Sequence, residues 1–437
     1  MARSIVALIG RQNVGKSTLL NRLAGKRVAI VDDVPGTTRD RVVAHVRVGD
    51  NEFTVVDTGG LELGSETAMA GEINEQAGVA IAEADVIAFL VDVRDGLVPV
   101  DLEIADRIRK AGKPVVLLAN KADNAKYEAG AVDFYELGLG EPLAVSAYHN
   151  RGIAEAVDRI TALLPAPEPA PDQPGAIKVA IVGRPNVGKS TLLNAALGEE
   201  RAIVSEVPGT TRDAIDTLVD FEGESVLLID TAGIKRRGRI GTGVGRYSVI
   251  RALKAVERAD VALLVLDSEE LVTAQDMHIA GYIQQAAKGI IIIVNKWDLV
   301  QAEDKAEYDQ YIKGQFRFMP YAPLLHVSAK LGRGVKKIMP QVGQIYKERF
   351  KRLSTAAVNS VVQDAVAAHS LPRKGNRQLK IFYATQAEVN PPTFVFFANS
   401  PQLMHFSYQR YLENRLRKSF GFEGTPLRFV FKSRNEQ

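Results

Sequence analysis

The chain has 437 residues, of which 46% are hydrophobic; it carries a formal net charge of +3 and no cysteine. This length allows about three ordinary domains, and the composition excludes an intrinsically disordered chain. The lack of cysteine excludes disulfides, thiolate metal sites and cysteine nucleophiles. No apolar run approaches the roughly 20 residues that span a bilayer, and the start does not resemble a signal peptide, so we expect a cytoplasmic protein with no membrane association.

The first 164 residues alternate short apolar runs with longer helical stretches. Such alternation predicts an α/β fold, with a mainly parallel sheet and helices on both faces. The runs expected to form strands are Ile5–Ile9, Val42–Val48, Phe53–Asp57, Val86–Val91, Val115–Ala119 and Leu143–Val145.

A phosphate-binding motif follows the first expected strand and opens a helix. It fits the pattern G-x-x-x-x-G-K-S/T, in which backbone N–H groups and the helix N-terminus surround phosphates. Lys16 is expected to reach the β- and γ-phosphates, and Ser17 to bind Mg²⁺. The nucleotide contacts expected here are Gly10, Arg11, Gln12, Asn13, Val14, Gly15, Lys16 and Ser17.

Two further segments of this region are expected to respond to the γ-phosphate. Thr37 and Thr38 lie on a loop that would meet Mg²⁺, and Thr38 is the favoured metal-sensing residue. Asp57 is expected to hold Mg²⁺ in its outer sphere, and Gly60 to sense the γ-phosphate. Ras-type enzymes place a water-orienting glutamine next, where this chain has a leucine, so hydrolysis must be organised differently or be slow. The expected contacts here are Asp57, Thr58, Gly59, Gly60 and Leu61.

The base is chosen by the motif Asn-Lys-x-Asp, which follows the strongly apolar run at 115–119. Asp123 can accept both guanine N1–H and the exocyclic N2–H, whereas adenine offers neither donor at that place. The sequence therefore predicts GTP and GDP as ligands. The contacts expected are Asn120, Lys121, Ala122, Asp123, Ser146 and Ala147.

All these motifs recur in the same order, at offsets that grow from 173 to 175 and 182, which indicates a duplicated domain. We expect domains at 1–164 and 176–350, separated by a semi-rigid spacer at 165–175 that contains five prolines. In the second copy, Ser190, Thr211 and Asp230 (outer sphere) are the expected Mg²⁺ ligands, and Lys189, Thr211 and Gly233 join Lys16, Thr38 and Gly60 as the expected catalytic residues. The second set of nucleotide contacts is Gly183, Arg184, Pro185, Asn186, Val187, Gly188, Lys189, Ser190, Asp230, Thr231, Ala232, Gly233, Ile234, Asn295, Lys296, Trp297, Asp298, Ser328 and Ala329.

The segment 351–437 reads as helix, strand, strand, helix, strand and is strongly basic. It holds 13 Lys/Arg and 5 Asp/Glu, a charge of +8 that leaves −5 on the rest of the chain. This asymmetry suggests a polyanionic partner, and the alternative is a basic solvated face. Gly421–Gly424 spells the G-x-x-G of RNA-clamping domains but lies between a helix and a strand, so we interpret it as a turn. The preferred candidates for RNA contact are Arg373, Lys374, Arg377 and Lys380.

The two motif sets resemble the EngA/Der family of bacterial double-domain GTPases, within the TrmE-Era-EngA-like group. The C-terminal segment strengthens the resemblance through Tyr383–Gln386, Asn390–Asn399, Tyr411–Asn414 and Gly424–Pro426. The resemblance implies a KH-like third domain and a role in assembly of the large ribosomal subunit, with ribosomal RNA as partner.

The resemblance also points to K⁺ as an activator, held partly by Asn13 and Asn186. The alternative is that both are turn residues tolerant of unusual backbone angles. Gln12 stands where the family usually has proline, and Gly245 where it usually has glutamate.

We therefore expect a monomeric GTPase that acts as a nucleotide-controlled switch. Two alternatives remain open: an RNA-binding scaffold whose hydrolysis is incidental, and a GTPase directed at tRNA.

Overall fold

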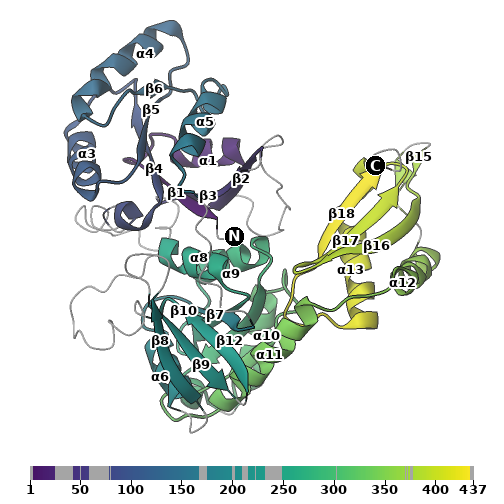
Figure 1. The fold of residues 1–437 in the computed structure, drawn as a ribbon. Helices are drawn as coiled ribbons and strands as arrows, with labels where there is room; N and C mark the ends of the chain where they lie inside the picture. The colour runs from purple at the N-terminus through teal and green to yellow at the C-terminus, as the bar shows by residue number, and fades with distance from the viewer. Residues whose placement is uncertain are drawn as a thin grey trace.

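The protein is described by a computed structural model that covers residues 3–24, 43–49, 51–58, 78, 80–166, 175–198, 202–208, 215–221, 223–231, 249–301, 303–369, 371, 373–374 and 377–433. These residues form three lobes in chain order (Figure 1). Two lobes are built on large mixed sheets, and the third, smaller lobe on a three-stranded sheet. No helix in these ranges is long and apolar enough to cross a membrane.

The first lobe is a six-stranded sheet in the order β2-β3-β1-β4-β5-β6. Only the β2–β3 pair is antiparallel, which confirms the predicted mainly parallel sheet. The strands are β1 (Ser4–Ile9), β2 (Val43–Val48), β3 (Asn51–Asp57), β4 (Val86–Asp92), β5 (Val115–Asn120) and β6 (Leu143–Ala144). The helices are α1 (Lys16–Leu23), α3 (Pro99–Ala111), α4 (Ala125–Ala129), η2 (Gly130–Leu137) and α5 (Ile153–Leu163).

Alternate residues of β1 supply the cores on the two faces of this sheet. Val6 and Leu8 pack with α1 and α5, whereas Ile5, Ala7 and Ile9 belong to the cluster that contains α3. Both faces are covered, so the central strands are continuously apolar rather than alternating.

The second lobe repeats this plan with seven strands in the order β13-β12-β11-β7-β10-β9-β8. The pairs β8–β9 and β9–β10 are antiparallel and the others are parallel. The strands are β7 (Ile177–Val182), β8 (Ala202–Pro208), β9 (Ile215–Phe221), β10 (Glu224–Ile229), β11 (Val261–Asp267), β12 (Gly289–Asn295) and β13 (Leu324–His326). The helices are α6 (Lys189–Leu197), α8 (Val249–Arg258), α9 (Ala274–Gln285), η4 (Trp297–Leu299), α10 (Lys305–Gln315), η5 (Val335–Lys337) and α11 (Ile338–Arg349).

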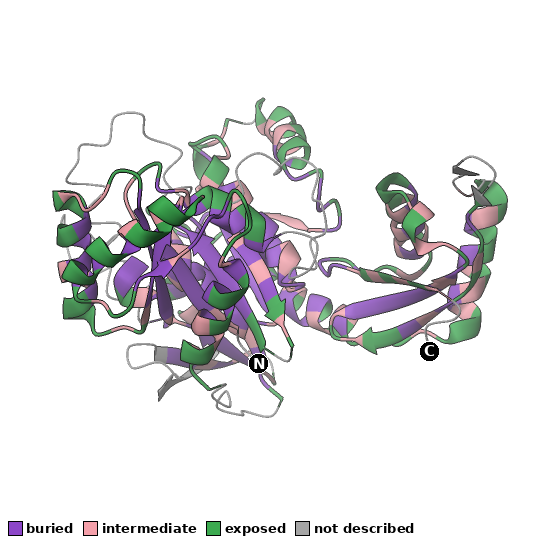
Figure 2. Ribbon diagram, turned by 90° about the horizontal axis from the view of Figure 1, so that it is seen from above, coloured by how far each residue is buried: buried purple, intermediate pink, exposed green. Residues whose placement is uncertain are grey.

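The third lobe has the predicted order helix, strand, strand, helix, strand. It consists of α12 (Thr355–Ala368), β16 (Ile381–Val389), β17 (Pro392–Ala398), η6 (Pro401–Leu403), α13 (Phe406–Phe420) and β18 (Arg428–Ser433). A short hairpin, β14 (Arg373–Lys374) with β15 (Arg377–Gln378), was not predicted. Figure 2 shows buried residues concentrated in the strands, with the helices of this lobe more exposed.

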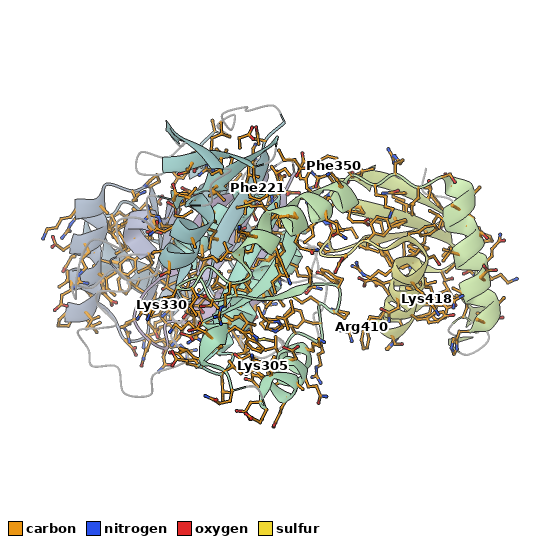
Figure 3. All side chains as sticks on the ribbon, turned by 90° about the horizontal axis from the view of Figure 1, so that it is seen from below. Phe221, Lys305, Lys330, Phe350, Arg410 and Lys418 are labelled. Atoms are coloured by element: carbon orange, nitrogen blue, oxygen red, sulfur yellow. The ribbon has the colours of Figure 1, made fainter. Side chains whose placement is uncertain are left out.

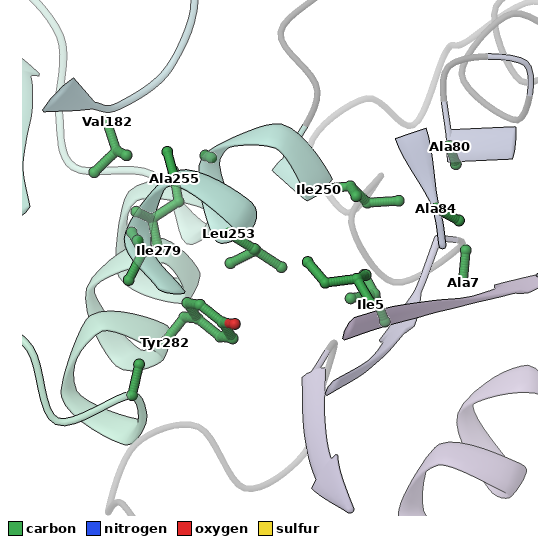
Figure 4. Close-up of a cluster of buried hydrophobic side chains, with 14 of the residues drawn as sticks. Ile5, Ala7, Ala80, Ala84, Val182, Ile250, Leu253, Ala255, Ile279 and Tyr282 are labelled. Atoms are coloured by element: carbon green, nitrogen blue, oxygen red, sulfur yellow. The ribbon is translucent and has the colours of Figure 1, made fainter. Parts of the chain in front are cut away.

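The two larger lobes share one hydrophobic cluster. Ile5 and Ala84 of the first lobe lie in the same buried cluster as Ile250 and Leu253 of α8 (Figure 4). Lys254, also on α8, pairs with Asp85 of the first lobe. Helix α8 therefore belongs to the second lobe and also packs against the sheet of the first.

A buried histidine lies beside this junction. The His45 ring on β2 lies 5.5 Å from the ring of Tyr282 on α9, and Arg3 lies 3.5 Å from Glu257. Burial, assisted by the positive charge of Arg3, lowers the pKa of His45 to about 4. His45 is therefore neutral at pH 7, and the junction buries no histidine charge.

The third lobe is bonded to the second through the turn after α13. Gly424 N–H donates to the carbonyl oxygen of Tyr321 (2.8 Å), and Ile290 N–H donates to the carbonyl oxygen of Gly424 (2.8 Å). A Cβ atom on Gly424 would lie 2.3 Å from Ile345, so only glycine fits. The segment Gly421–Gly424 is thus a turn, as predicted, and it docks against the second lobe.

Candidate active sites

The phosphate loop of the first lobe is positioned by close backbone contacts. Gly10 and Gly15 have φ values of 152° and 98°, and a Cβ atom on Gly15 would lie 2.3 Å from the amide nitrogen of Asn120. That amide donates to the carbonyl oxygen of Val14 at 2.7 Å. The two glycines therefore let the loop sit directly against the base-reading strand end.

Two side chains of this loop face the place where phosphates and metal would bind. Lys16 Nζ donates to the carbonyl oxygens of Gly10 (2.7 Å) and Arg11 (2.8 Å), so its ammonium lies over the loop. Ser17 Oγ donates to Asp57 Oδ2 at 2.6 Å. Hydroxyl and carboxylate oxygens are ligands suited to Mg²⁺, which usually takes few protein ligands and completes its shell with phosphates and water.

The base-reading residues of the first lobe are brought together by two loops. Asn120 Oδ1 accepts a bond from the N–H of Ala147 (3.0 Å), which joins the two loops. Asp123 Oδ1 accepts from Ser146 Oγ at 2.6 Å, and this bond, with the charge of Arg94, lowers the pKa of Asp123. Asp123 is thus ionised and can accept two donors from guanine.

The second lobe repeats these contacts almost residue for residue. Lys189 Nζ donates to the carbonyl oxygen of Gly183 at 2.7 Å. Asn295 donates to Val187 (2.9 Å) and accepts from the N–H of Ala329 (3.0 Å). A hydrogen bond from Ser328 lowers the pKa of Asp298. The duplicated sequence therefore gives the phosphate loops and the base-reading loops of both lobes the same contacts.

The aspartate expected to hold Mg²⁺ at the second site has different surroundings. Asp230 has a left-handed backbone, with φ 56°. Its Oδ2 lies 2.9 Å from Nε of Arg251 on α8, and Arg251 Nη1 lies 4.0 Å from Glu83 of the first lobe. The second site is therefore in ionic contact with the first lobe through one arginine.

Buried carboxylates hold the arginine of each phosphate loop, and the sequence analysis missed them. Arg11 lies 3.7 Å from Asp101, and Arg184 lies 2.8 Å from Asp276. Burial raises the pKa of Asp101 to about 6 and also raises that of Asp276. The signal that would have found them is the repeat itself, since 101 and 276 differ by 175.

A second missed pair supports the lysine of each base-reading motif. Lys121 lies 2.5 Å from Asp92, and Lys296 lies 2.5 Å from Asp267. These aspartates end β4 and β11, and they too are 175 residues apart. Each holds the lysine that precedes the guanine-reading aspartate by two positions.

The asparagines expected to hold K⁺ both have left-handed backbones, with φ 65° at Asn13 and 64° at Asn186. This geometry is what the alternative role as turn residues requires, and asparagine tolerates it better than most residues. Gln12 and Pro185 are both exposed at the same place in the two loops. The phosphate loop of the first lobe thus keeps the same turn with Gln12 in place of a proline.

Several expected site residues lie outside the described residues. These are Thr37, Thr38, Gly59, Gly60, Leu61, Thr211, Ala232, Gly233, Ile234 and Gly245, most of the spacer, and the side chains of Arg373, Lys374 and Arg377.

Basic residues of the third lobe are divided between its surface and its interface with the second lobe. Arg410 and Lys418 of α13 and Lys380 are exposed, and the first two are labelled in Figure 3. Arg417 instead pairs with Glu413 (2.7 Å) and lies 4.1 Å over the ring of Tyr321. Fewer basic residues of this lobe are therefore exposed than the count of Lys and Arg in its sequence suggested.

Known protein families match all three lobes. A profile described as a 50S ribosome-binding GTPase matches residues 5–121 and 178–296. One described as the elongation factor Tu GTP binding domain matches 246–348, and one described as the KH-domain-like C-terminal domain of EngA bacterial GTPase enzymes matches 352–432.

Full-length relatives are similar along the whole chain. The GTPase Der of Heliobacterium modesticaldum is 48% identical over 440 residues, covering 100% of both chains. That of Thermomicrobium roseum is 50% identical over 440 residues, covering 98% of this chain and 96% of the relative. Among solved structures, Era in complex with MgGDPNP and nucleotides of 16S ribosomal RNA is 23% identical with a TM-score of 0.30, covering 58% of this chain and 91% of Era.

Proposed function

Because the chain belongs to the EngA/Der family of GTPases, we propose that it is a nucleotide-controlled switch in the assembly of the large ribosomal subunit. The observation that carries this proposal is the position of α8. This helix contacts Asp230 of the second site through Arg251 and packs its apolar side against the sheet of the first lobe. A change at the second site therefore has a direct physical route to the arrangement of the lobes.

The residues of each site would divide the chemistry of GTP hydrolysis between them. The phosphate-loop N–H groups and Lys16 or Lys189 would bind the phosphates, and Asp123 or Asp298 would select guanine. Mg²⁺, held by Ser17 and Asp57 or by their counterparts, would neutralise charge on the phosphates. K⁺ near Asn13 and Asn186 would supply positive charge where an arginine finger acts in other GTPases.

The third lobe would supply much of the attraction to ribosomal RNA. Exposed cations such as Arg410 and Lys418 lie on one helix, eight residues apart, and so on a similar face. Their attraction to phosphate is independent of sequence and falls steeply with salt. Selectivity must then come from how the GTPase lobes place this basic lobe.

The test is sedimentation of the full chain with large ribosomal subunits, in a non-hydrolysable GTP analogue and in GDP, across a salt series. We expect binding that differs between the two nucleotides, because a nucleotide shifts a conformational equilibrium only through differential affinity. The double variant Arg410→Gln/Lys418→Gln should reduce the salt slope by about 1–2, since each lost phosphate contact removes roughly 0.7–0.9.

The matched control is Lys313→Gln, which removes an exposed cation from the second lobe and should leave the slope unchanged. Equal binding to the ribosomal subunit in the GTP analogue and in GDP would exclude the switch and favour the scaffold with incidental hydrolysis. Co-purification of tRNA in place of ribosomal particles would favour the tRNA-directed alternative.

A further inference from the structure

The carboxylate that reads guanine in the first site is also the partner of an arginine. Arg94 follows β4, and its backbone N–H donates to Asp92 Oδ1 at 3.0 Å. Its guanidinium donates from Nη2 to Asp123 Oδ2 and lies 5.5 Å from the ring centroid of Tyr127 on α4. Arg94 therefore engages the oxygen of Asp123 that Ser146 does not.

Guanine needs the same carboxylate oxygens that these two side chains engage. Its N1–H and N2–H would be donated to Asp123, where Oδ1 already accepts from Ser146 and Oδ2 from Arg94. A carboxylate has about four acceptor positions, so Oδ1 can keep its serine bond while accepting a further donor. The bulky guanidinium on Oδ2 would obstruct the approach of guanine to that oxygen.

Arg94 is also the partner best able to move. Half of its side chain is exposed (49%), whereas Asp123 is only 15% exposed. Ser146 is buried in a turn that its own backbone closes with Arg151 (3.0 Å). An incoming base would therefore displace Arg94 towards solvent and leave Ser146 in place.

The second site has the opposite charge at this position. The offset of 175 places Glu269 where the first site has Arg94, and Glu269 Oε2 lies 3.3 Å from Nζ of Lys296. A glutamate at pH 7 has no donor for Asp298. Asp298 accepts a hydrogen bond from Ser328 and feels the charges of Lys330 and Arg333, but no guanidinium hydrogen bond like that of Arg94 is described on it.

We propose that Arg94 sets the affinity of the first site by competing with guanine for Asp123. The first site then binds guanine nucleotides more weakly and releases them faster than the same site would without the arginine. Asp123 still selects the base at the first site, as Asp298 does at the second, so Arg94 alters affinity and exchange while base choice stays unchanged.

The experiment compares the full chain with Arg94→Gln, which keeps a polar side chain but removes the charge. The dissociation constant and release rate of fluorescent GDP at the first site are measured in an Asp298→Ala background that binds one GDP per chain. Trp297, the single tryptophan, lies in the base-reading motif of the second site, so energy transfer from it reports that site in the unmodified background.

We expect Arg94→Gln to lower the dissociation constant of the first site about threefold, comparable to one partly exposed ion pair, and to slow release in proportion. The gain should shrink as salt screens the pair in the parent chain. Arg94→Lys, which keeps the charge, should stay close to the parent chain. Glu269→Arg should raise the dissociation constant of the second site by a similar factor.

Unchanged affinity in Arg94→Gln would overturn the proposal, because the arginine would then not compete. Weaker binding would also overturn it, since Arg94 would then contribute a contact to the nucleotide. The second site of Arg94→Gln, followed through Trp297, shows that the variant is folded and must keep its parental affinity.

Discussion

In the first nucleotide site Asp123 is held by Arg94 and Asp57 is held by Ser17, whereas the second site pairs Glu269 with Lys296 and Asp230 with Arg251. Both sites nevertheless have the same glycine contacts, the same asparagine bridge and the same lysine–aspartate pair behind the base motif. An arginine thus contacts the carboxylate proposed to read the base in one copy and the carboxylate proposed to hold Mg²⁺ in the other.

This difference shows that the two copies share the glycines that the loop backbone requires and differ in the charged residues beside the nucleotide site. A Cβ atom on Gly15 or Gly188 would lie within 2.3 Å of an asparagine amide, so neither position tolerates change. An arginine or glutamate at the position of Arg94 is compatible with the same turn. The two sites can therefore bind the same nucleotide with different affinities.

The largest effect is expected from exchanging the base-reading carboxylates. Asp123→Asn and Asp298→Asn should each weaken GTP binding at one site by at least about 10³-fold, because the amide presents a donor to guanine donors. Each variant should gain xanthosine triphosphate at that site, where xanthine offers an oxygen. Binding of both nucleotides, counted per chain, is the measurement, and two tight GTP sites in either variant would refute the assignment.

The copies should respond differently in one respect. Asp123→Asn also removes the carboxylate to which Arg94 donates a hydrogen bond, whereas Asp298 interacts with Lys330 and Arg333 only through their charges. Xanthosine triphosphate should thus meet less competition at the first site than GTP does in the parent chain.

The strands could be predicted because buried parallel strands are continuous apolar runs. Val86–Val91 was predicted and β4 spans Val86–Asp92, while the run at Leu143–Val145 yields only the two residues of β6. The hairpin β14–β15 was missed because its residues are polar and lack any apolar alternation.

The site motifs could be predicted because each is local, but the partners of their charges could not. Arg94 reaches Asp123 across 29 residues, and Arg417 is turned towards Tyr321 of another lobe. Such pairs depend on how strands and lobes pack, which no short motif encodes. The repeat offset of 175 marks Asp92 and Asp101 as duplicated, and it is the only sequence signal that could have singled them out.

Acid sensitivity offers a second comparison between the copies. Burial raises the pKa of Asp101 to about 6 from 3.8, so the folded chain takes up a proton between these values more readily than the unfolded chain. The contribution of Asp101 to stability is therefore greatest at low pH and falls as the pH rises towards 6. In Asp101→Asn, thermal unfolding should lose this component of the pH dependence between pH 4 and 7.

The matched variant is Asp276→Asn. Asp276 also accepts bonds from the N–H (3.0 Å) and hydroxyl (2.9 Å) of Thr273 at the start of α9. Asparagine keeps an amide oxygen that can accept both bonds, so this variant should retain the cap and lose only the pH-dependent component. Unfolding curves for Asp101→Asn that run parallel to those of the parent chain would contradict the assignment of Asp101.

Potassium dependence can separate the two roles left open for the phosphate-loop asparagines. We expect KCl to speed hydrolysis about tenfold over NaCl at matched ionic strength, by stabilising charge that develops between the β- and γ-phosphates. Asn13→Gly and Asn186→Gly keep the left-handed backbone and remove only the side chain, because glycine adopts these angles freely. Each should abolish stimulation at its own site; stimulation that survives in both would leave them as turn residues only.

The smallest effect concerns the contact between Arg251 and Asp230. Arg251 Nε lies 2.9 Å from the carboxylate proposed to hold Mg²⁺ through its outer sphere, so the arginine and the hydrated ion compete for one group. Arg251→Gln should lower the Mg²⁺ concentration needed for GTP binding at the second site about threefold, in keeping with one partly exposed ion pair. The first site, where Ser17 contacts Asp57, should keep its Mg²⁺ requirement.

Glu83 of the first lobe attracts the same guanidinium from 4.0 Å. Glu83→Gln should therefore strengthen the ion pair between Arg251 and Asp230 and raise the Mg²⁺ concentration needed at the second site, by less than about twofold. The double variant Arg251→Gln/Glu83→Gln decides the route, followed through Trp297: if Glu83→Gln has no effect once Arg251 is replaced, the first lobe acts on the second site through this arginine, whereas an effect that persists would mean that the charges near Asp230 are simply additive.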